Sequence, residues 1–305
     1  MINRIIKFGI GSLFFLSLFS CKEQPIGVDF SNIQKSDTTY VTTVDTPQTK
    51  NYYIEEFSGV RCTNCPQGAA KLEALNTAND GRLKIVTVHN GGLTAPNYNL
   101  GSKQDFRVVQ GLQLMTLIYG GDLSKPNASF DRLNLGPNPT APLVGAVSQW
   151  DAMLAAAKNE SPSTPVNIYL ESKRSNSDPN VFNIVVKLAY TESVATPQYL
   201  SIYLIEDNII DNQIDPFIEN FNFRHVFRQS LLPITGTPIL ADLSTIEPGR
   251  VYESKIKFVL DPNDEDLYRQ KFWNLDNVYI VAFVHNGTAG EDKRVYQAVD
   301  THLKP

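Results

Sequence analysis

Cysteine is scarce in this sequence, with three residues in a chain of 305, at positions 21, 62 and 65. A fold held together by several disulfides is therefore excluded. Clusters of lysine and arginine are also missing, and the formal net charge is −5 at pH 7, which argues against a nucleic-acid-binding protein. No P-loop, dinucleotide fingerprint, Ser/His/Asp order or paired-carboxylate motif stands out, so the sequence indicates none of the enzyme classes that these motifs mark.

The apolar run near the N-terminus, residues 8–19, is too short to cross a membrane. It follows Arg4 and Lys7, which is the arrangement of a secretory signal peptide. We predict a signal peptide over residues 1–20. The rest of the chain has the apolar content of a globular protein and is long enough for two domains.

Residues 18–21, Leu-Phe-Ser-Cys, resemble the lipobox of bacterial lipoproteins, in which the cysteine receives the lipid. The resemblance implies a lipid on Cys21, and the alternative is a secretory signal followed by an unrelated free cysteine. Lipidation would leave Cys62 and Cys65 as the only thiols, outside the cytosol, where a disulfide can persist. Residues 21–50 are rich in Thr, Asp, Gln and Ser with little apolar pattern, and we expect a flexible tether there.

Cys62 and Cys65 form a Cys-x-x-Cys motif where a short apolar run ends and a helical pattern begins. The unpaired N–H groups and partial positive charge of a helix N-terminus stabilise a thiolate. Three interpretations are open: a working dithiol in which Cys62 attacks and Cys65 resolves, a structural disulfide, and half of a metal site. A closed metal site needs four ligands, and no other cysteine or histidine pair lies within reach, so we expect no metal and no cofactor.

The pattern around this motif predicts a βαβ unit. Residues 52–57 alternate as a strand does, residues 66–76 carry alanine and leucine at helical spacing, and residues 83–89 are apolar nearly throughout. Parallel strands end at the same edge of a sheet, so we expect His89 to emerge on the same edge as Cys62. This places His89 as a candidate near the sulfurs.

Three further elements follow: a helix over residues 105–119, a strand over 128–133 and a helix over 142–158. With the βαβ unit, their order makes residues 52–158 resemble the thioredoxin-like fold. The resemblance implies that Cys62 is the exposed attacking thiol and Cys65 the buried resolving one.

The resemblance also assigns roles to two residues outside the motif. Glu56 falls where thioredoxins keep a buried acid that assists proton transfer, and Pro126 where the family has a cis-proline facing the disulfide. This sequence departs from the family in Arg61, where a tryptophan is usual, and in Thr63 and Asn64, which replace Gly-Pro. The redox potential and the choice of partner therefore stay open.

Residues 161–165, Ser-Pro-Ser-Thr-Pro, are a compact linker and the predicted boundary between a thioredoxin-like domain, 51–160, and a second domain, 166–305. Beyond the linker, short alternating runs separated by turn signals predict an antiparallel, immunoglobulin-like β-sandwich. The predicted strands are residues 166–172, 181–190, 199–206, 226–232, 251–260, 278–285 and 294–299, with a short helical turn at 264–272. The fold class is thus α/β plus all-β.

The four histidines of the chain show no metal-ligand spacing, and each except His89 is interpreted as a surface or turn residue. The aromatic stretch 217–227, with Arg224, His225 and Arg228 interleaved, is interpreted as a strand with a packed connection, and a partner-binding loop is the alternative.

Lipobox, thioredoxin-like domain and β-sandwich together resemble the Omp28-type outer membrane lipoproteins of Bacteroidota. The resemblance implies an exported protein of the cell envelope, held by its N-terminal lipid at the outer membrane, on its periplasmic or surface face. The functional hypothesis is a thiol–disulfide exchange site with a protein thiol or disulfide as partner, without nucleic acid. The alternative is a non-catalytic binding, adhesion or structural lipoprotein that uses the β-sandwich as its contact surface, so enzyme activity stays open.

Overall fold

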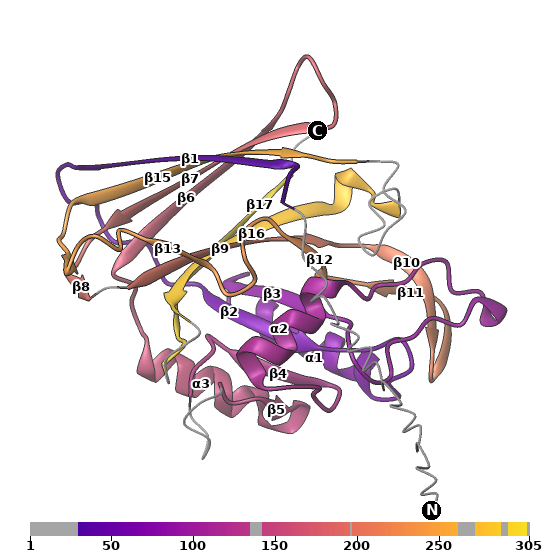
Figure 1. Cartoon of the computed structure of the whole chain (residues 1–305). Helices are drawn as coiled ribbons and strands as arrows, with labels where there is room; N and C mark the ends of the chain where they lie inside the picture. Colours follow the sequence, from indigo (N-terminus) through magenta and orange to yellow (C-terminus); the bar gives the residue numbers. More distant parts are fainter. Residues whose placement is uncertain (1–29, 135–141, 196, 262–271, 288–291, 304–305) are drawn as a thin grey trace, which may run out of the picture.

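The computed structural model describes residues 30–134, 142–195, 197–261, 272–287 and 292–303, which form a predominantly β structure with three α-helices (Figure 1). Nine strands make a large mixed sheet in the order β17-β16-β9-β12-β3-β2-β4-β5, with β13 paired to β9. A second sheet of four strands, β1-β15-β7-β6, lies over one part of it. No helix of the described part is long and apolar enough to cross a membrane.

The helices are α1 (Cys65–Thr77), α2 (Val109–Tyr119) and α3 (Trp150–Glu160), with 3₁₀ turns η1 (Tyr98–Leu100), η2 (Val147–Gln149) and η4 (Leu275–Asn277). The strands of the large sheet are β17 (Val295–His302), β16 (Val278–Asn286), β9 (Gln198–Glu206), β12 (Val226–Ser230), β3 (Leu83–Val88), β2 (Tyr52–Phe57), β4 (Asn127–Phe130), β5 (Gly145–Ala146) and β13 (Thr237–Ile239). The four-stranded sheet contains β1 (Ile33–Val41), β15 (Arg250–Val259), β7 (Val181–Tyr190) and β6 (Val166–Arg174). Two small antiparallel pairs are β10 (Ile209–Ile214) with β11 (Phe217–Phe223), and β8 (Val194–Ala195) with β14 (Thr245–Ile246).

The predicted βαβ unit is present as β2, α1 and β3. Strands β2 and β3 pair in parallel from Tyr52 opposite Leu83 to Phe57 opposite Val88, because the crossover helix returns the chain to the same end of the sheet. Helix α1 begins with a proline in its first turn and buries Leu72 and Leu75. Each of these side chains contributes roughly 1.5–3 kcal/mol by leaving water.

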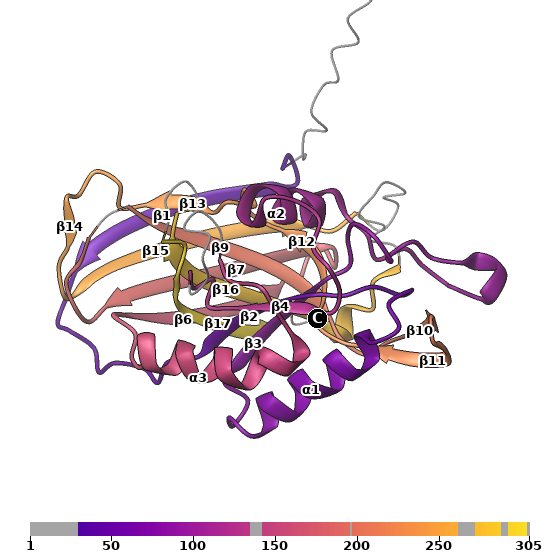
Figure 2. The same cartoon turned by 90° about the horizontal axis from the view of Figure 1, so that it is seen from below.

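Helices cover both faces of this part of the large sheet. Alternate side chains of β2 and β3 point to opposite faces, so Tyr52 and Ile54 pack with α1 and α3 while Tyr53 and Phe57 pack with α2. Figure 2 shows α1 and α3 side by side below the sheet. The order of β2, α1, β3, α2, β4 and α3 is the order of elements predicted over residues 52–158.

Two predicted helices begin later than the sequence suggested. Helix α2 starts at Val109 instead of residue 105, because Val108 is extended and its carbonyl accepts a hydrogen bond from the Asn90 side chain at 2.8 Å. Helix α3 starts at Trp150 instead of 142. The residues before it form β5 and η2, and the Trp150 Nε1 donates to the carbonyl of Gly145 at 2.7 Å.

All seven strands predicted after residue 165 are present, as β6, β7, β9, β12, β15, β16 and β17. Strand β11 lies in the stretch 217–227, which the sequence indicated as a strand with a packed connection. The short strands β8, β10, β13 and β14 were not predicted, because two to six residues give too little alternation to detect. The helical turn expected at 264–272 lies, except for its last residue, outside the described residues.

The expectation of a flexible tether over residues 21–50 is wrong for its central part. Ile33–Val41 forms β1, which pairs antiparallel with β15 from Ile33 opposite Phe258 to Val41 opposite Arg250. Most of its side chains are exposed, so the strand is held by backbone hydrogen bonds at the edge of the sheet and leaves no apolar alternation in the sequence. Residues 21–29 lie outside the described residues.

The two halves of the chain share one sheet and one buried cluster. Strand β12, from beyond the predicted linker, pairs in parallel with β3 and antiparallel with β9. One buried cluster contains Tyr53 and Val86 from the first half together with Tyr203 and Phe283 from the second. A separate cluster fills the space between the four-stranded sheet and strands β9 and β16 of the large sheet.

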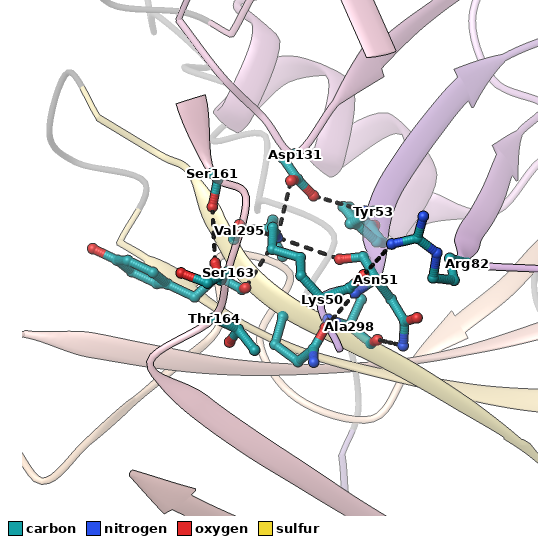
Figure 3. A network of polar contacts seen from close by, with 12 residues as sticks. Lys50, Asn51, Tyr53, Arg82, Asp131, Ser161, Ser163, Thr164, Val295 and Ala298 are labelled. Atoms are coloured by element: carbon teal, nitrogen blue, oxygen red, sulfur yellow. Dashed lines mark hydrogen bonds and ion pairs between the residues drawn. The ribbon is translucent and has the colours of Figure 1, made fainter. Parts of the chain in front are cut away.

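Buried ion pairs fasten the halves together, and Figure 3 shows the first of them. The Lys50 Nζ lies 3.0 Å from a carboxylate oxygen of Asp131 and donates to the carbonyls of Val295 and Tyr296 at 3.2 and 2.9 Å. Asp131 also accepts from the backbone N–H of Tyr53 at 2.7 Å. Both charged side chains are fully buried, so this network joins β2 and the end of β4 to β17.

The second ion pair joins Glu55 of β2 to Arg132, and both side chains are fully buried. Tyr53 donates to Glu55 at 2.7 Å, and Tyr119 of α2 donates to the same carboxylate. Arg132 in turn contacts the hydroxyl of Tyr203 on β9 at 3.2 Å. Because the carboxylate and guanidinium keep several partners each, the charges are held away from water without being left alone.

Candidate functional site

Cys62 and Cys65 form a disulfide at the start of α1, with their Cα atoms 5.3 Å apart. Both are buried: 1% of Cys62 and 3% of Cys65 is exposed. The expectation that Cys62 is exposed is therefore wrong in this conformation. The expected burial of Cys65 is confirmed.

Hairpin β10–β11 of the C-terminal half covers the disulfide. The burial of Cys62 could not be predicted from the residues around the motif, because the covering hairpin belongs to the other half of the chain. The Gln213 side chain donates to the carbonyls of Gly59 and Cys62 at 3.2 and 3.1 Å. The N–H of Ile214 donates to the carbonyl of Val60 at 2.6 Å. These contacts run along the loop that precedes α1, so the hairpin is tied to the motif itself.

A further contact of the hairpin reaches Thr63, which lies between the two cysteines. Thr63 donates its hydroxyl hydrogen to a carboxylate oxygen of Asp215, at the hairpin turn, at 3.1 Å. Phe217 and Ile218 at the start of β11 are exposed, in contrast to the covered sulfurs. The hairpin stands at one end of the molecule in both views (Figures 1 and 2).

Glu56 lies on β2 and is buried, as the thioredoxin-like resemblance implied. One of its carboxylate oxygens accepts a hydrogen bond from Thr87 at 2.9 Å, and the other has no partner among the described residues. Burial raises the pKa of Glu56 to about 7, against the lowering effects of the Thr87 hydrogen bond and of His225, and with a further rise from Glu73. The carboxyl group is therefore poised to gain or lose a proton near neutral pH.

His89 follows β3 and is buried against the rings of Phe106 and Phe223, at centroid distances of 5.3 and 5.8 Å. Burial, with the nearby charge of Arg228, lowers the pKa of His89 to about 3, so the ring is neutral. Neither ring nitrogen makes a hydrogen bond of normal geometry with a described side chain.

The structure brings three of the predicted residues together. Cys65, Glu56 and His89 line one small cavity of about 20 Å³ behind the disulfide. The strand-edge argument for His89 thus led to the correct neighbourhood, although its neutral, apolar setting does not favour a role as a base at neutral pH.

Pro126 precedes β4, and the Lys125–Pro126 peptide bond is cis, as the resemblance implied. Its ring lies against α1 at Gly68, where an added Cβ would come within 3.0 Å of the proline Cβ. Glycine at this position allows the helix that carries Cys65 to approach the proline closely.

A larger cavity of about 190 Å³ opens beside α1 and shares Glu56 with the small one. Its lining residues are Glu56, Pro66, Ala69, Ala70, Leu72, Glu73, Ile85, Thr87, Phe221, Asn222, Arg224 and His225. The stretch 217–227, noted in the sequence for its aromatic and basic residues, supplies one wall as β11 and the turn into β12.

Charged side chains form a cluster of ion pairs at this turn. Arg224 contacts Glu73 and also Asp207, the latter at 3.2 Å, and the His225 Nε2 lies 2.7 Å from Glu73. Asp207 has a lowered pKa despite its burial, because His225 and Arg224 stabilise its charge. Glu73 and Gln213 were not predicted, since their partners lie about 150 residues away in the sequence.

The other histidines do not join this site. His285 is buried on β16, with its Nε2 3.0 Å from the Ser201 hydroxyl, and His302 stacks on Tyr279. Within the described ranges, no group of three or more His, Cys, Asp or Glu side chains could hold a metal ion.

Comparison with known proteins identifies relatives of this chain. Residues 139–303, more than half of the sequence, match the model of a family described as outer membrane protein Omp28. HBP35 of Porphyromonas gingivalis has a similar fold, with a TM-score of 0.60 and 18% identity over 84% of this chain and 76% of its own. A domain of the outer membrane lipoprotein Omp28 from the same organism matches at a TM-score of 0.30 and 20% identity, over 48% of this chain and 93% of the domain. No curated protein matches the sequence.

Proposed function

The chain belongs to the Omp28 family of outer membrane proteins, and on that premise we propose that it is an envelope lipoprotein that carries out thiol–disulfide exchange at Cys62 and Cys65. Family membership places the protein at the outer membrane. The exchange activity is the step that the site geometry supports.

The proposal rests mainly on the burial of the Glu56 carboxyl group beside Cys65. A buried carboxyl group with one unpartnered oxygen destabilises a fold, and a purely structural disulfide gains nothing from it. Glu56 and Cys65 line the same small cavity, and the pKa of Glu56 is about 7. An acid of this pKa is suited to exchange a proton with a nearby sulfur.

The chemistry follows from the placement of the three groups. A partner thiolate attacks the Cys62 sulfur, the Cys62–Cys65 bond breaks, and Cys65 leaves as a thiolate that takes the proton of Glu56. A second thiolate of the partner then attacks the partner sulfur that is bonded to Cys62. The mixed disulfide breaks, the partner gains a disulfide, and Cys62 leaves as a thiolate. The hairpin β10–β11 must move before the first step, because it covers Cys62.

The burial of Cys62 under hairpin β10–β11 favours a second, non-catalytic function. With 1% of Cys62 exposed, the thioredoxin-like part would serve as a scaffold, and the C-terminal part, proposed as an immunoglobulin-like β-sandwich over 166–305, would be the surface that binds a partner. The disulfide would then only hold the start of α1.

Exchange assays separate the two functions. The protein lacking residues 1–21 is expected to reduce insulin when coupled to a dithiol, and Cys62→Ser is expected to abolish this. Absence of turnover in the wild type, even with a large excess of dithiol, would leave the scaffold function. A Cys65→Ser variant that accumulates a mixed disulfide through Cys62 would show which thiol attacks.

We also propose that Cys21 carries the lipid and that residues 1–20 are removed, although both lie outside the described residues. Labelling cells with a fatty-acid analogue is expected to mark the wild-type protein and not Cys21→Ser. Label retained in Cys21→Ser would contradict the anchor.

A further inference from the structure

The 190 Å³ cavity beside α1 has an apolar body and one polar end. Leu72, Ile85 and Phe221 contribute apolar walls, and Ala69 and Ala70 of α1 leave space where larger side chains would fill it. At about 30 Å³ for each water molecule in the liquid, this volume corresponds to roughly six waters, enough for one aromatic ring with a short arm.

The polar end is the carboxyl group of Glu56. Its unpartnered oxygen is fully shielded from solvent and the residue is 98% buried, with 2% exposed, while the other oxygen is occupied by Thr87. An ionised carboxylate only accepts hydrogen bonds, so the group that completes it must be a donor. The donors that line the cavity have other partners: Asn222 donates to Asn208 at 3.3 Å, and Arg224 and His225 contact Glu73.

The charges around the cavity favour a cationic donor. Glu56, Glu73 and Asp207 are opposed by Arg224 and by His225, and Arg224 is already held by Glu73 and Asp207. With Glu56 ionised, the cluster has an excess of negative charge even if His225 is protonated. A bound anion would face this excess directly.

We propose that this cavity binds a small organic amine, with its apolar body between α1 and β11 and its ammonium group on the carboxyl group of Glu56, whose shielded free oxygen turns toward the cavity on binding. The proposal does not depend on thiol–disulfide exchange, because neither sulfur takes part in it. It does predict that an amine bound in the cavity prevents Glu56 from exchanging a proton with Cys65.

Binding is coupled to protonation of Glu56. Glu73, Arg224 and His225 face the carboxyl group from α1 and from the turn into β12, and the neutral His89 faces the small cavity behind it. An ammonium ion selects the ionised form of an acid whose pKa is about 7. Amine affinity is therefore expected to rise about tenfold from pH 6 to pH 8 and to level off above pH 8.

The test uses the disulfide form of the protein lacking residues 1–21 and isothermal titration calorimetry. Benzylamine is the probe, with benzyl alcohol and benzoate as neutral and anionic analogues of the same shape. Saturable benzylamine binding at pH 8 is expected, at least about tenfold tighter than that of either analogue. Proton release at pH 7, read from heats in two buffers of different ionisation enthalpy, is expected to accompany it.

Three variants make the result decisive. Glu56→Gln keeps the shape and is expected to remove both the preference for the amine and the pH dependence. Ala69→Leu, which fills the cavity from α1, is expected to weaken all binding, and the exposed Glu192→Gln is the matched control that leaves it unchanged. Thermal melts confirm that each variant is folded.

The proposal is overturned if the wild type shows no saturable binding of benzylamine at pH 8, or if Glu56→Gln binds it equally well. Binding of the amine by a protein that shows no insulin reduction would separate this site from the proposed exchange function. Exchange without amine binding would refute this inference alone.

Discussion

At the residue scale, Glu56 is the most informative side chain of the molecule. The sequence marked it through its distance from the Cys-x-x-Cys motif, and the structure explains its properties through burial and a missing hydrogen-bond partner. The same two features give it a measurable effect on stability.

Glu56→Gln is expected to stabilise the protein at pH 8 and to have little effect at pH 5. The folded-state pKa of about 7 lies above the ordinary value of 4.5, so the folded state holds its proton more tightly and wild-type stability falls as pH rises from 4.5 through 7. Removing the acid abolishes that loss, which amounts to about 3 kcal/mol at most. Urea denaturation at the two pH values measures it.

A control variant isolates this effect. Glu192→Gln removes an exposed carboxyl group and is expected to change the free energy of unfolding by less than about 0.5 kcal/mol at either pH. Equal stability of Glu56→Gln and wild type at pH 8 would mean that the carboxyl group is not strained by its burial.

At the scale of single elements, the hairpin β10–β11 determines how accessible the disulfide is. It pairs with neither the nine-stranded nor the four-stranded sheet, and it is attached to the Cys-x-x-Cys motif through Gln213, Ile214 and Asp215. Its apolar contacts are confined to a small buried cluster, in which Ile209 and Phe223 pack with Val60 and Phe106. An element with so small a share of the core opens locally more easily than a core strand does.

Gln213→Ala is expected to speed chemical reduction of the Cys62–Cys65 disulfide about tenfold. Loss of the hydrogen bonds to Gly59 and Cys62 weakens the closed hairpin by about 1.4 kcal/mol, which raises the open population by that factor. Reduction by excess dithiothreitol, followed by alkylation and mass spectrometry, gives the rate.

The exposed Gln34→Ala on β1 is the matched control and should reduce at the wild-type rate. If Gln213→Ala and wild type are reduced equally fast, the hairpin does not limit access to the sulfurs, and reagents reach them by another route.

At the scale of the whole molecule, the two halves behave as one cooperative structure. Strand β12 lies between β3 and β9, and the Lys50–Asp131 pair bridges β2, β4 and β17. The predicted division at residues 161–165 therefore separates two sequence patterns, while one buried cluster contains residues of both halves.

Lys50→Met is expected to destabilise the protein by roughly 3–5 kcal/mol, because it leaves Asp131 buried without its counter-charge. The double variant Lys50→Met/Asp131→Asn is expected to recover much of that loss. Equilibrium unfolding in urea compares the three proteins, and a single variant as stable as wild type would show that the pair contributes nothing.

A fragment of residues 51–160 is expected not to fold alone. Without β12, the edge of β3 is unpaired, and the apolar face of β2 and β3 loses the packing of Tyr203, Phe227 and Phe283. Near-ultraviolet circular dichroism and a cooperative melt measure this. A cooperative transition in the fragment would support two independent domains.

Much of this structure follows from local sequence patterns. Alternating and helical apolar spacing predicted β2, α1, β3 and the seven longer strands after residue 165, because burial of one face imposes the period of the element on the sequence. The Cys-x-x-Cys motif and the acid six residues before it identified Cys65 and Glu56, two of the residues that line the small cavity.

The elements that the sequence missed have no such local period. Strand β1 exposes most of its side chains and depends on backbone pairing with the distant strand β15, and β10 is short and pairs with the adjacent β11. By itself, the sequence determined the position of the sulfur pair on a helix N-terminus and the buried acid beside it. Only the tertiary structure decided that the pair is covered, because the cover comes from about 150 residues further along the chain, where no pattern near Cys62 can specify it.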